Sequence, residues 1–313
     1  MKPYPPEDPL RSAAEDFGPL RDFVAADARL ARWARGGSSA RRWLYEFARF
    51  GFKQAVACVF GGLLVALMIA THYLYPRDAP LHRYDFLFLA AVLIQIVLLR
   101  TRFETWEEAK IIFIFHVVGT IMEVFKTSAG SWIYPDDAIF RIGGVPLFTG
   151  FMYAAIGSYM MRAWSLFDFR FEHHPRLGVV AALAAAIYAN FFLHHYVPDL
   201  RIALFVACAA VFGRSWIYYR IHHSWRRMPM LVAAFLAATF IWIAENAGTY
   251  TQTWLYPAQR GGWVMVVPAK LGSWFLLQIV SYALVALVRR PQAPDNAPLL
   301  ASQVRHRRRL RRA

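Results

Sequence analysis

Eight apolar stretches divide this chain, and they constrain its fold more than any other feature of the sequence. A bilayer core about 30 Å thick is crossed by roughly 20 helical residues at about 1.5 Å per residue. The stretches meet this requirement, although the second is short and contains Gln95. They cover residues 51–74, 84–99, 108–127, 144–163, 177–194, 202–219, 228–250 and 263–288. The sequence therefore predicts an all-α polytopic membrane protein with about eight transmembrane helices.

Positive charge gathers at the ends of these stretches and predicts how the chain is oriented. The formal net charge is +15, although only 18% of the residues are charged. With eight spans and both termini inside, nine Lys or Arg fall in inner loops and five in outer loops, and the Arg-rich termini increase this excess. We therefore expect a multi-pass protein of the bacterial inner membrane with cytoplasmic N- and C-termini. Charge that flanks apolar spans favours membrane lipids as partners and argues against nucleic acid.

The two ends of the chain differ from its apolar part. Residues 8–35 alternate apolar and charged positions at helical spacing, which predicts a helix on the inner membrane face. A partly disordered arm is the alternative. The basic run 305–309 predicts an anchor to anionic lipid. Cys58 and Cys208 lie in apolar runs without metal-ligand spacing, and we interpret both as core residues.

A shift of 122 residues superimposes the second half of the apolar part on the first. Eight identities fall within 28 positions without a gap. They pair Glu123 with Glu245, Thr127 with Thr249, Trp132 with Trp254, Tyr134 with Tyr256, Pro135 with Pro257, Val145 with Val267, Pro146 with Pro268, and Gly150 with Gly272. Each copy would hold four spans, so both copies face the same way and predict a two-fold pseudo-axis along the membrane normal.

This repeat predicts four regions in the chain. They are a cytoplasmic arm with its amphipathic helix (1–49), a first membrane repeat (50–170), a second membrane repeat (171–290) and a basic cytoplasmic tail (291–313).

Each repeat carries a glutamate near the outer end of its third span. A carboxylate in hydrocarbon is costly, so it normally pairs, faces a cavity or takes part in function. Lys126 lies on the same helix face as Glu123, and Lys270 enters the last span as a partner for Glu245. Either these four residues form two structural ion pairs, or they line a polar chamber near the outer leaflet. We take them as candidate catalytic residues.

Other polar and aromatic side chains are placed near the same end of the spans. The candidate substrate-binding residues are Trp132, Tyr134, Trp254, Tyr256, Asn246, His72, His194 and His116. Trp and Tyr also prefer the membrane interface for structural reasons, and a histidine within an apolar helix is also explained by a core hydrogen bond. A metal site is a further alternative, and it would use His72, His194, Glu123 and Glu245. No known ligand spacing supports that site, so we predict no metal and leave any cofactor open.

The runs 122–135 and 144–153 resemble an uncharacterised family of bacterial membrane proteins, the YoaT-like proteins. This resemblance covers about residues 40–290 and implies a membrane location without an established activity. A second, shorter resemblance is to the membrane carotenoid hydratases and lycopene cyclases. It rests on Glu123, Gly130, Trp132, Tyr134 and residues 144–147, while Lys126 and the tandem copy depart from that pattern.

The second resemblance implies chemistry that begins with proton delivery to an alkene carbon. A carboxylic acid in a low-dielectric site keeps its proton to higher pH and can act as that acid, and aromatic faces stabilise a developing cation. We therefore expect a membrane-embedded enzyme that acts on a lipid or isoprenoid through Glu123 or Glu245. A transporter or channel for a small solute or ion, and a structural or partner-binding membrane protein, are the alternatives. The oligomeric state stays open.

Overall fold

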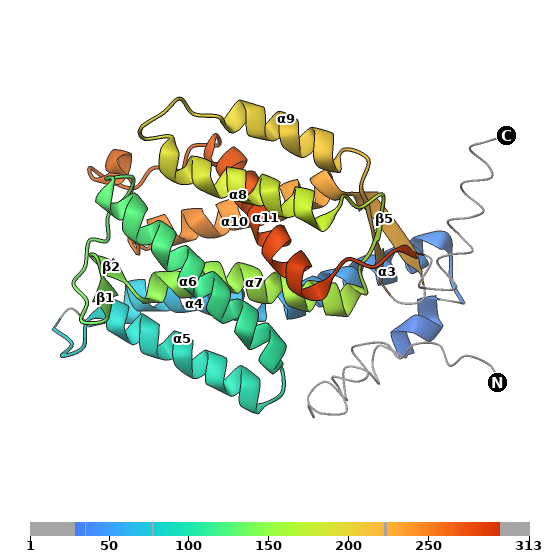
Figure 1. Cartoon of the computed structure of the whole chain (residues 1–313). Coiled ribbons are helices and arrows are strands. Elements are labelled where there is room, and N and C mark those ends of the chain that lie inside the picture. Colours follow the sequence, from blue (N-terminus) through green and yellow to red (C-terminus); the bar gives the residue numbers. More distant parts are fainter. Residues whose placement is uncertain (1–28, 35, 77, 222–223, 295–313) are drawn as a thin grey trace.

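The computed structural model describes residues 29–34, 36–76, 78–221 and 224–294. Most of the predicted arm 8–35, and the whole of the basic run 305–309, lie outside these residues. The described part is mostly helical, and α11 (Lys270–Arg289) crosses its other helices obliquely (Figure 1). They are α3 (Ser39–Ala57), α4 (Val59–Leu74), α5 (Arg83–Arg100), α6 (Trp106–Ser128), α7 (Phe148–Phe167), α8 (Leu177–Leu193), α9 (Arg201–Phe212), α10 (Met230–Tyr250), α11 (Lys270–Arg289) and the short 3-10 helix η1 (Pro257–Gln259).

The helices α6, α10 and α11 are long and apolar enough to cross a membrane. The pair α3 and α4 adds a fourth candidate if the two helices, which meet at 69° around Cys58, form one span. The described residues therefore give three or four candidate spans by this measure, and the predicted count of eight is not confirmed. Cys58 is exposed at the break, so our interpretation of it as a core residue is wrong, whereas Cys208 is buried as expected.

The sixth predicted stretch, residues 202–219, differs most from the structure. Helix α9 ends at Phe212 after 12 residues, which corresponds to about 18 Å of helix and falls short of a bilayer core. The remainder of the stretch enters strand β4 (Trp216–Arg220). Its aromatic and β-branched residues favour a strand over a helix.

Short strands at opposite ends of the bundle depart from the all-α prediction (Figure 1). β1 (Arg141–Ile142) and β2 (Val145–Pro146) form a hairpin whose turn, Gly143 and Gly144, has positive φ at both residues. Glycine adopts these angles without strain, as such tight turns require. At the other end, β3 (Arg170–Glu172), β4 and β5 (Trp225–Pro229) form an antiparallel sheet.

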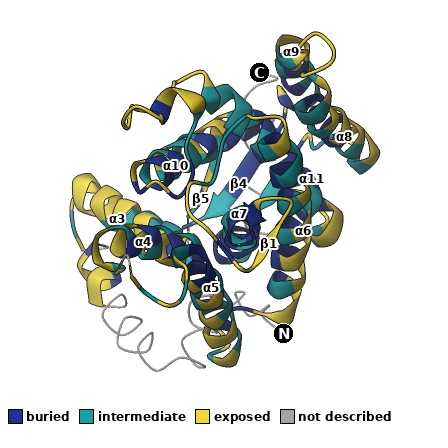
Figure 2. Cartoon of the chain, turned by 90° about the vertical axis from the view of Figure 1, so that its left-hand side faces the viewer, coloured by how far each residue is buried: buried dark blue, intermediate teal, exposed yellow. Residues whose placement is uncertain are grey.

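Helix α7 lies at the centre of the bundle, with α4, α5, α6 and α11 packed around it, while α8 and α9 lie at the periphery (Figure 2). A Cβ atom on Gly119 of α6 would lie 2.6 Å from the ring of Tyr153 on α7. The glycine therefore lets the two helices approach and brings Tyr153 towards the carboxylate of Glu123, one helical turn further along α6.

The 122-residue offset recurs in the helix bounds and in the packing. Both ends of α11 lie 122 residues after the ends of α7, and α10 ends 122 residues after α6. Helix α4 packs on α7 as α8 packs on α11, and α4 packs on α10 as α8 packs on α6. The helix bounds and the packing thus follow the same offset as the sequence, and the repeat itself stays a prediction.

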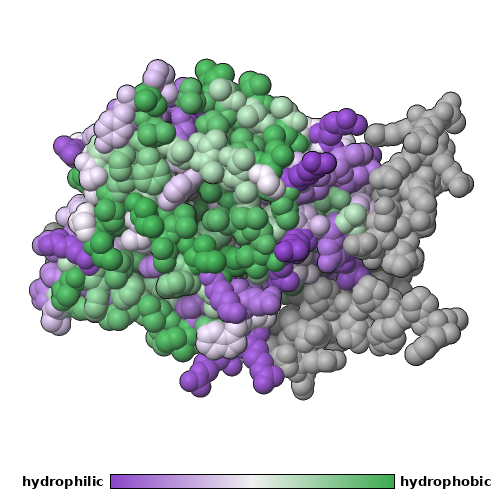
Figure 3. Space-filling view, in the orientation of Figure 1, coloured by the Kyte–Doolittle hydropathy of each residue, from purple (hydrophilic) through white to green (hydrophobic). Residues whose placement is uncertain are grey.

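Large apolar side chains cover the outside of the bundle. A broad hydrophobic band lies between two more polar ends (Figure 3). Leu93, Phe113, Ile202 and Phe240 are among the exposed side chains. An apolar surface of this extent is unusual for a protein surrounded by water, and together with the apolar helices it supports membrane association.

Candidate functional site

A cavity of about 1120 Å³ lies inside the bundle, among α3, α4, α6, α7, α8, α10 and α11. Its lining is mostly apolar, and the charged side chains gather at one end. We call this end, which contains Glu123 and Glu245, the carboxylate end, and we call the opposite end, near Gln54 and Tyr219 of strand β4, the sheet end. Gly62 of α4 and Phe240 of α10 line the cavity and are exposed, so the cavity is open between these two helices.

Glu123 is buried on α6 and accepts hydrogen bonds from three aromatic side chains. Its Oε2 accepts one hydrogen bond from the indole N–H of Trp132, at 2.7 Å, and another from the hydroxyl of Tyr134. Its Oε1 accepts from the hydroxyl of Tyr153 at 2.5 Å. The protein therefore supplies donors to both oxygens of this carboxyl group, which offsets much of the cost of its burial.

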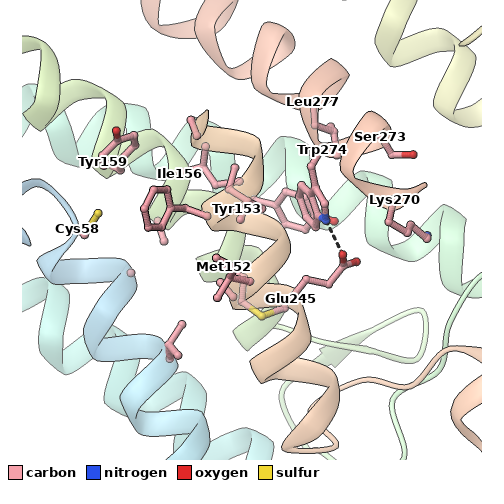
Figure 4. Close-up of a pocket in the computed structure, with 18 of the residues that line it drawn as sticks. Cys58, Met152, Tyr153, Ile156, Tyr159, Glu245, Lys270, Ser273, Trp274 and Leu277 are labelled. Atoms are coloured by element: carbon pink, nitrogen blue, oxygen red, sulfur yellow. Dashed lines mark hydrogen bonds between the residues drawn. The ribbon is translucent and has the colours of Figure 1, made fainter. Parts of the chain in front are cut away.

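Glu245 occupies the corresponding place on α10 but has two donors. The hydroxyl of Tyr256 donates to Oε1 at 2.5 Å, and the indole N–H of Trp274 donates to Oε2 at 2.6 Å (Figure 4). The position 122 residues after Tyr153 is Phe275, which has no hydroxyl. The two glutamates are thus held in similar ways, and Glu245 keeps more of its hydrogen-bonding capacity for another group.

Lys270, at the start of α11, lies beside these aromatic rings. Its Nζ is 4.3 Å from the ring centroid of Tyr256 and 5.5 Å from that of Trp132. Its charge acts on the carboxylates of both Glu245 and Glu123, although no ion pair within 4 Å joins it to either in the described part of the chain. The predicted pairing of Lys270 with Glu245 is therefore a longer-range attraction, assisted by cation–π contacts.

Lys126 does not pair with Glu123, contrary to our expectation. Its Nζ lies 3.4 Å from Nε2 of His194 and 3.2 Å from Nε2 of His195. The side chain points from α6 towards the end of α8, while aromatic donors bind the carboxylate of Glu123. Residues three apart lie on one face of a helix, but this spacing alone does not determine their contacts.

The two tyrosines of the motif loops act as hydrogen-bond donors to the glutamates. Burial, and then the neighbouring carboxylate of Glu123, raises the pKa of Tyr134 well above its ordinary value. Burial and the carboxylate of Glu245 raise the pKa of Tyr256 in the same way. Both phenols therefore keep their protons, which the observed hydrogen bonds require.

Most of the predicted site residues line this cavity. They are Glu123, Lys126, Trp132, Tyr134, His194, Glu245, Trp254, Tyr256 and Lys270. The other three lie elsewhere. The side-chain oxygen of Asn246 accepts a hydrogen bond from the backbone N–H of Val266, in the loop before α11. His72 packs against Tyr73 and Tyr250, and His116 packs against Phe151.

The structure gives no support to the alternative metal site. His72 faces two tyrosines and does not line the cavity with the glutamates. Among the described residues, no group of three or more His, Cys, Asp or Glu is placed to hold a metal ion.

Sequence reasoning missed two residues that touch the glutamates, Tyr153 and Trp274. Each lies within two turns of the start of the helix that follows its motif loop. Trp274 also follows Lys270 by four residues, a spacing that places both on one helix face. A polar aromatic residue at this place in each repeat was the available signal. Arg201 and Ser273 also line the carboxylate end and were not predicted.

Comparisons with known proteins agree with the predicted resemblance to the YoaT-like proteins. "Uncharacterized protein YoaT" of Bacillus subtilis (strain 168) is 38% identical over 260 residues, which are 82% of this chain and 98% of the relative. Two crystal structures of MvINS, an Insig homolog from Mycobacterium vanbaalenii, one of them a cross-linked trimer, superimpose with a TM-score of 0.42. They cover 60% of this chain and 98% of theirs, at 19% and 18% sequence identity.

A family match covers most of the apolar part of the sequence. The family is described as "Protein of unknown function (DUF817)", and the match runs over residues 46–282. This range includes both motif loops and both glutamates. The chain therefore belongs to the DUF817 family.

Proposed function

We propose that this protein binds a lipid or isoprenoid amphiphile in its cavity, as a multi-pass protein of the bacterial inner membrane. In this proposal its eight apolar helices form two parallel repeats, and both termini are cytoplasmic. The observation that carries the proposal is the cavity itself. It is larger than the roughly 300–1,000 Å³ of typical ligand pockets, mostly apolar, and open between α4 and α10.

The distribution of polarity along the cavity favours an amphiphile. Charged and hydrogen-bonding side chains gather at the carboxylate end, while α4, α7 and α10 supply apolar side chains along the rest. A ligand with one polar end and a long apolar part would satisfy both regions. Such a ligand would enter from the bilayer through the opening between α4 and α10.

The same distribution argues against a transport path. The sheet end is lined by aromatic side chains, including Phe50, Phe167 and Phe169, and its polar side chains, Gln54, Tyr159 and Tyr219, are uncharged. An ion would lose its hydration there without gaining a charged partner. A cavity with charged groups at only one end is better suited to holding an amphiphile than to conducting an ion.

Acid catalysis on the bound lipid is a second candidate, and the asymmetry between the glutamates favours Glu245 for it. All three donors around Glu123 would compete with a substrate, whereas Glu245 accepts one hydrogen bond at each oxygen. Glu245→Gln should then abolish turnover of a lipid substrate, and Glu123→Gln should leave a larger residual rate. Equal loss in both variants would contradict this assignment.

Lipid binding is tested by obstructing the cavity. A Cβ atom on Gly62 meets no atom within 4 Å, so Gly62→Phe would place its ring in the opening without a backbone clash. Gly178, in the first turn of α8, has similar space and does not line the cavity, so Gly178→Phe is the matched control. Native mass spectrometry should detect lipid retained by the wild type and the control, and little by Gly62→Phe. Equal retention in all three proteins would overturn the proposal.

A further inference from the structure

We infer that the amphiphile bound in this cavity carries an anionic headgroup, a phosphate or a carboxylate, and that Lys126 is its main contact. The inference rests on the proposed lipid-binding function and specifies the ligand class. Its basis is the positive charge of Lys126, which has no carboxylate beside it among the described residues.

Lys126 is an ammonium group in an unusual place. Lys126 is 5% exposed, and its side chain lines the cavity. No carboxylate lies within 4 Å of its Nζ among the residues that the structure describes. Its polar contacts are with His194 and His195, and the ring of Phe191 lies 5.9 Å away. A buried charge that has only neutral partners is costly, and a counter-ion removes that cost.

The hydrogen bonds of His194 show why the histidines do not replace a counter-ion. Its Nδ1 lies 3.1 Å from the backbone oxygen of Asn190, so this nitrogen carries the proton and donates it there. The Nε2 lone pair then accepts from Lys126. The imidazole is neutral in this arrangement, so it orients the ammonium group of Lys126 and leaves the charge in place.

The other cations at this end have acidic partners. Arg201 forms an ion pair with Asp199, with 2.5 Å between Nε and Oδ2. Lys270 is attracted by the two glutamates described above. The positive charges of Lys270 and Arg201 act unfavourably on Lys126, while that of Asp199 acts favourably. Among the charged groups near it, Lys126 is thus the cation that lacks a partner of its own, and an anion beside it would also be attracted by Arg201 and Lys270.

The remaining cavity fits the rest of such a molecule. From Lys126 the lining continues over Met122 and Leu64 to Cys58 near the sheet end. A headgroup at Lys126 therefore leaves its hydrocarbon chain along α4, beside the opening to the bilayer. Polar contact at one end and apolar contact along the remainder describe an anionic lipid better than a free anion.

The test compares two lipids that differ by one phosphate. The full-length protein is placed in phosphatidylcholine nanodiscs with phosphatidic acid or diacylglycerol, each carrying the same diazirine-bearing chains, and the cross-linked fraction is measured by mass spectrometry. We expect phosphatidic acid to label cavity residues about tenfold more than diacylglycerol, the factor that one charge-assisted hydrogen bond provides. Lys126→Gln should remove this preference, and Lys126→Arg should retain it. Lys110→Gln, at an exposed lysine of the same helix, should behave as wild type.

Each other outcome identifies which statement fails. If Lys126→Gln retains the preference, or if both lipids label the wild type equally, the headgroup inference is wrong while lipid binding stands. If excess inorganic phosphate removes the labelling by phosphatidic acid, the site serves a free anion and the inference is wrong. If neither lipid labels cavity residues, or if Gly62→Phe leaves both yields unchanged, the proposed function fails. Lys126→Arg keeps the test valid should Lys126→Gln not fold.

Discussion

Ile133 and Leu255 pair their backbones in an antiparallel bridge, in which each N–H donates to the other carbonyl oxygen at 2.9 Å. The two positions are 122 residues apart, so each residue meets its counterpart in the other predicted repeat. A contact of a position with its own equivalent is what a two-fold axis produces. The bridge also places the rings of Trp132 and Tyr256 6.0 Å apart, and thereby brings the two motif loops to one cavity.

Breaking this bridge should loosen the carboxylate end. Leu255→Pro removes the N–H that donates to Ile133, at a cost of about 0.5–1.5 kcal/mol for the bond alone. We expect a lower melting temperature in detergent and weaker lipid retention. Leu255→Ala keeps the backbone donor and is the control for loss of the side chain. If both variants melt at the same temperature, the backbone pairing contributes nothing measurable.

The unequal number of donors predicts unequal stability of two glutamate variants. Glu123→Leu leaves three buried donors without an acceptor, and Glu245→Leu leaves two. Each orphaned donor costs about 1–3 kcal/mol. The thermal stability of the purified protein should therefore fall further for Glu123→Leu. The opposite order would show that the charge balance with Lys270 outweighs the hydrogen bonds.

Tyr153→Phe tests one of these donors without changing the packing. Phe275 already occupies the position 122 residues later, in the second predicted repeat, so we expect a phenyl ring to suit this place in the fold. Loss of a hydrogen bond to a carboxylate costs about 1.5–3 kcal/mol, against about 1 kcal/mol for a neutral pair. Tyr159→Phe, which removes the 3.1 Å bond to Gln54, is the comparison. Thermal unfolding should show a larger loss for Tyr153→Phe.

Hydrophobic length and the repeat predicted the helices and the location of the site. The apolar stretches overlap α4 through α11, because a long apolar run favours a helix wherever it is buried. The shared offset placed Glu123 and Glu245 at one end of the chain's fold, and both line the cavity. The Gly143-Gly144 turn and the aromatic, β-branched run of β4 carried strand signals that a search for spans passed over.

Side-chain partners could not be predicted from spacing. Lys126 lies on the helix face that spacing indicated, yet it contacts two histidines that follow α8. Asn246, predicted to bind substrate, instead binds the backbone of Val266. Both contacts depend on how distant segments pack, which one sequence does not specify. The residue equivalent to Lys126 is Gly248, where the ring of Trp254 fills the space, so even the two repeats differ at this position.

A buried carboxyl group outside the cavity gives the fold a pH dependence. Glu104 lies in the linker between α5 and α6, where Ser158 Oγ donates to Oε1 at 2.6 Å and Gln95 Nε2 donates to Oε2 at 2.5 Å. Burial raises the pKa of Glu104, and these hydrogen bonds and the charge of Arg162 offset only part of that rise. The folded chain therefore holds this proton at pH values where the unfolded chain has released it.

The sign of the effect follows from proton binding. Where the folded state binds more protons than the unfolded state, stability falls as pH rises. The contribution of Glu104 is fully present below its ordinary pKa and is lost as pH rises through its raised pKa in the folded chain. Glu104→Gln cannot titrate, so its unfolding free energy should decline less with pH than that of the wild type across this window. Glu107→Gln, at an exposed neighbour, should keep the wild-type profile. Parallel profiles for Glu104→Gln and the wild type, measured by thermal unfolding at several pH values, would show that Glu104 titrates alike in both states.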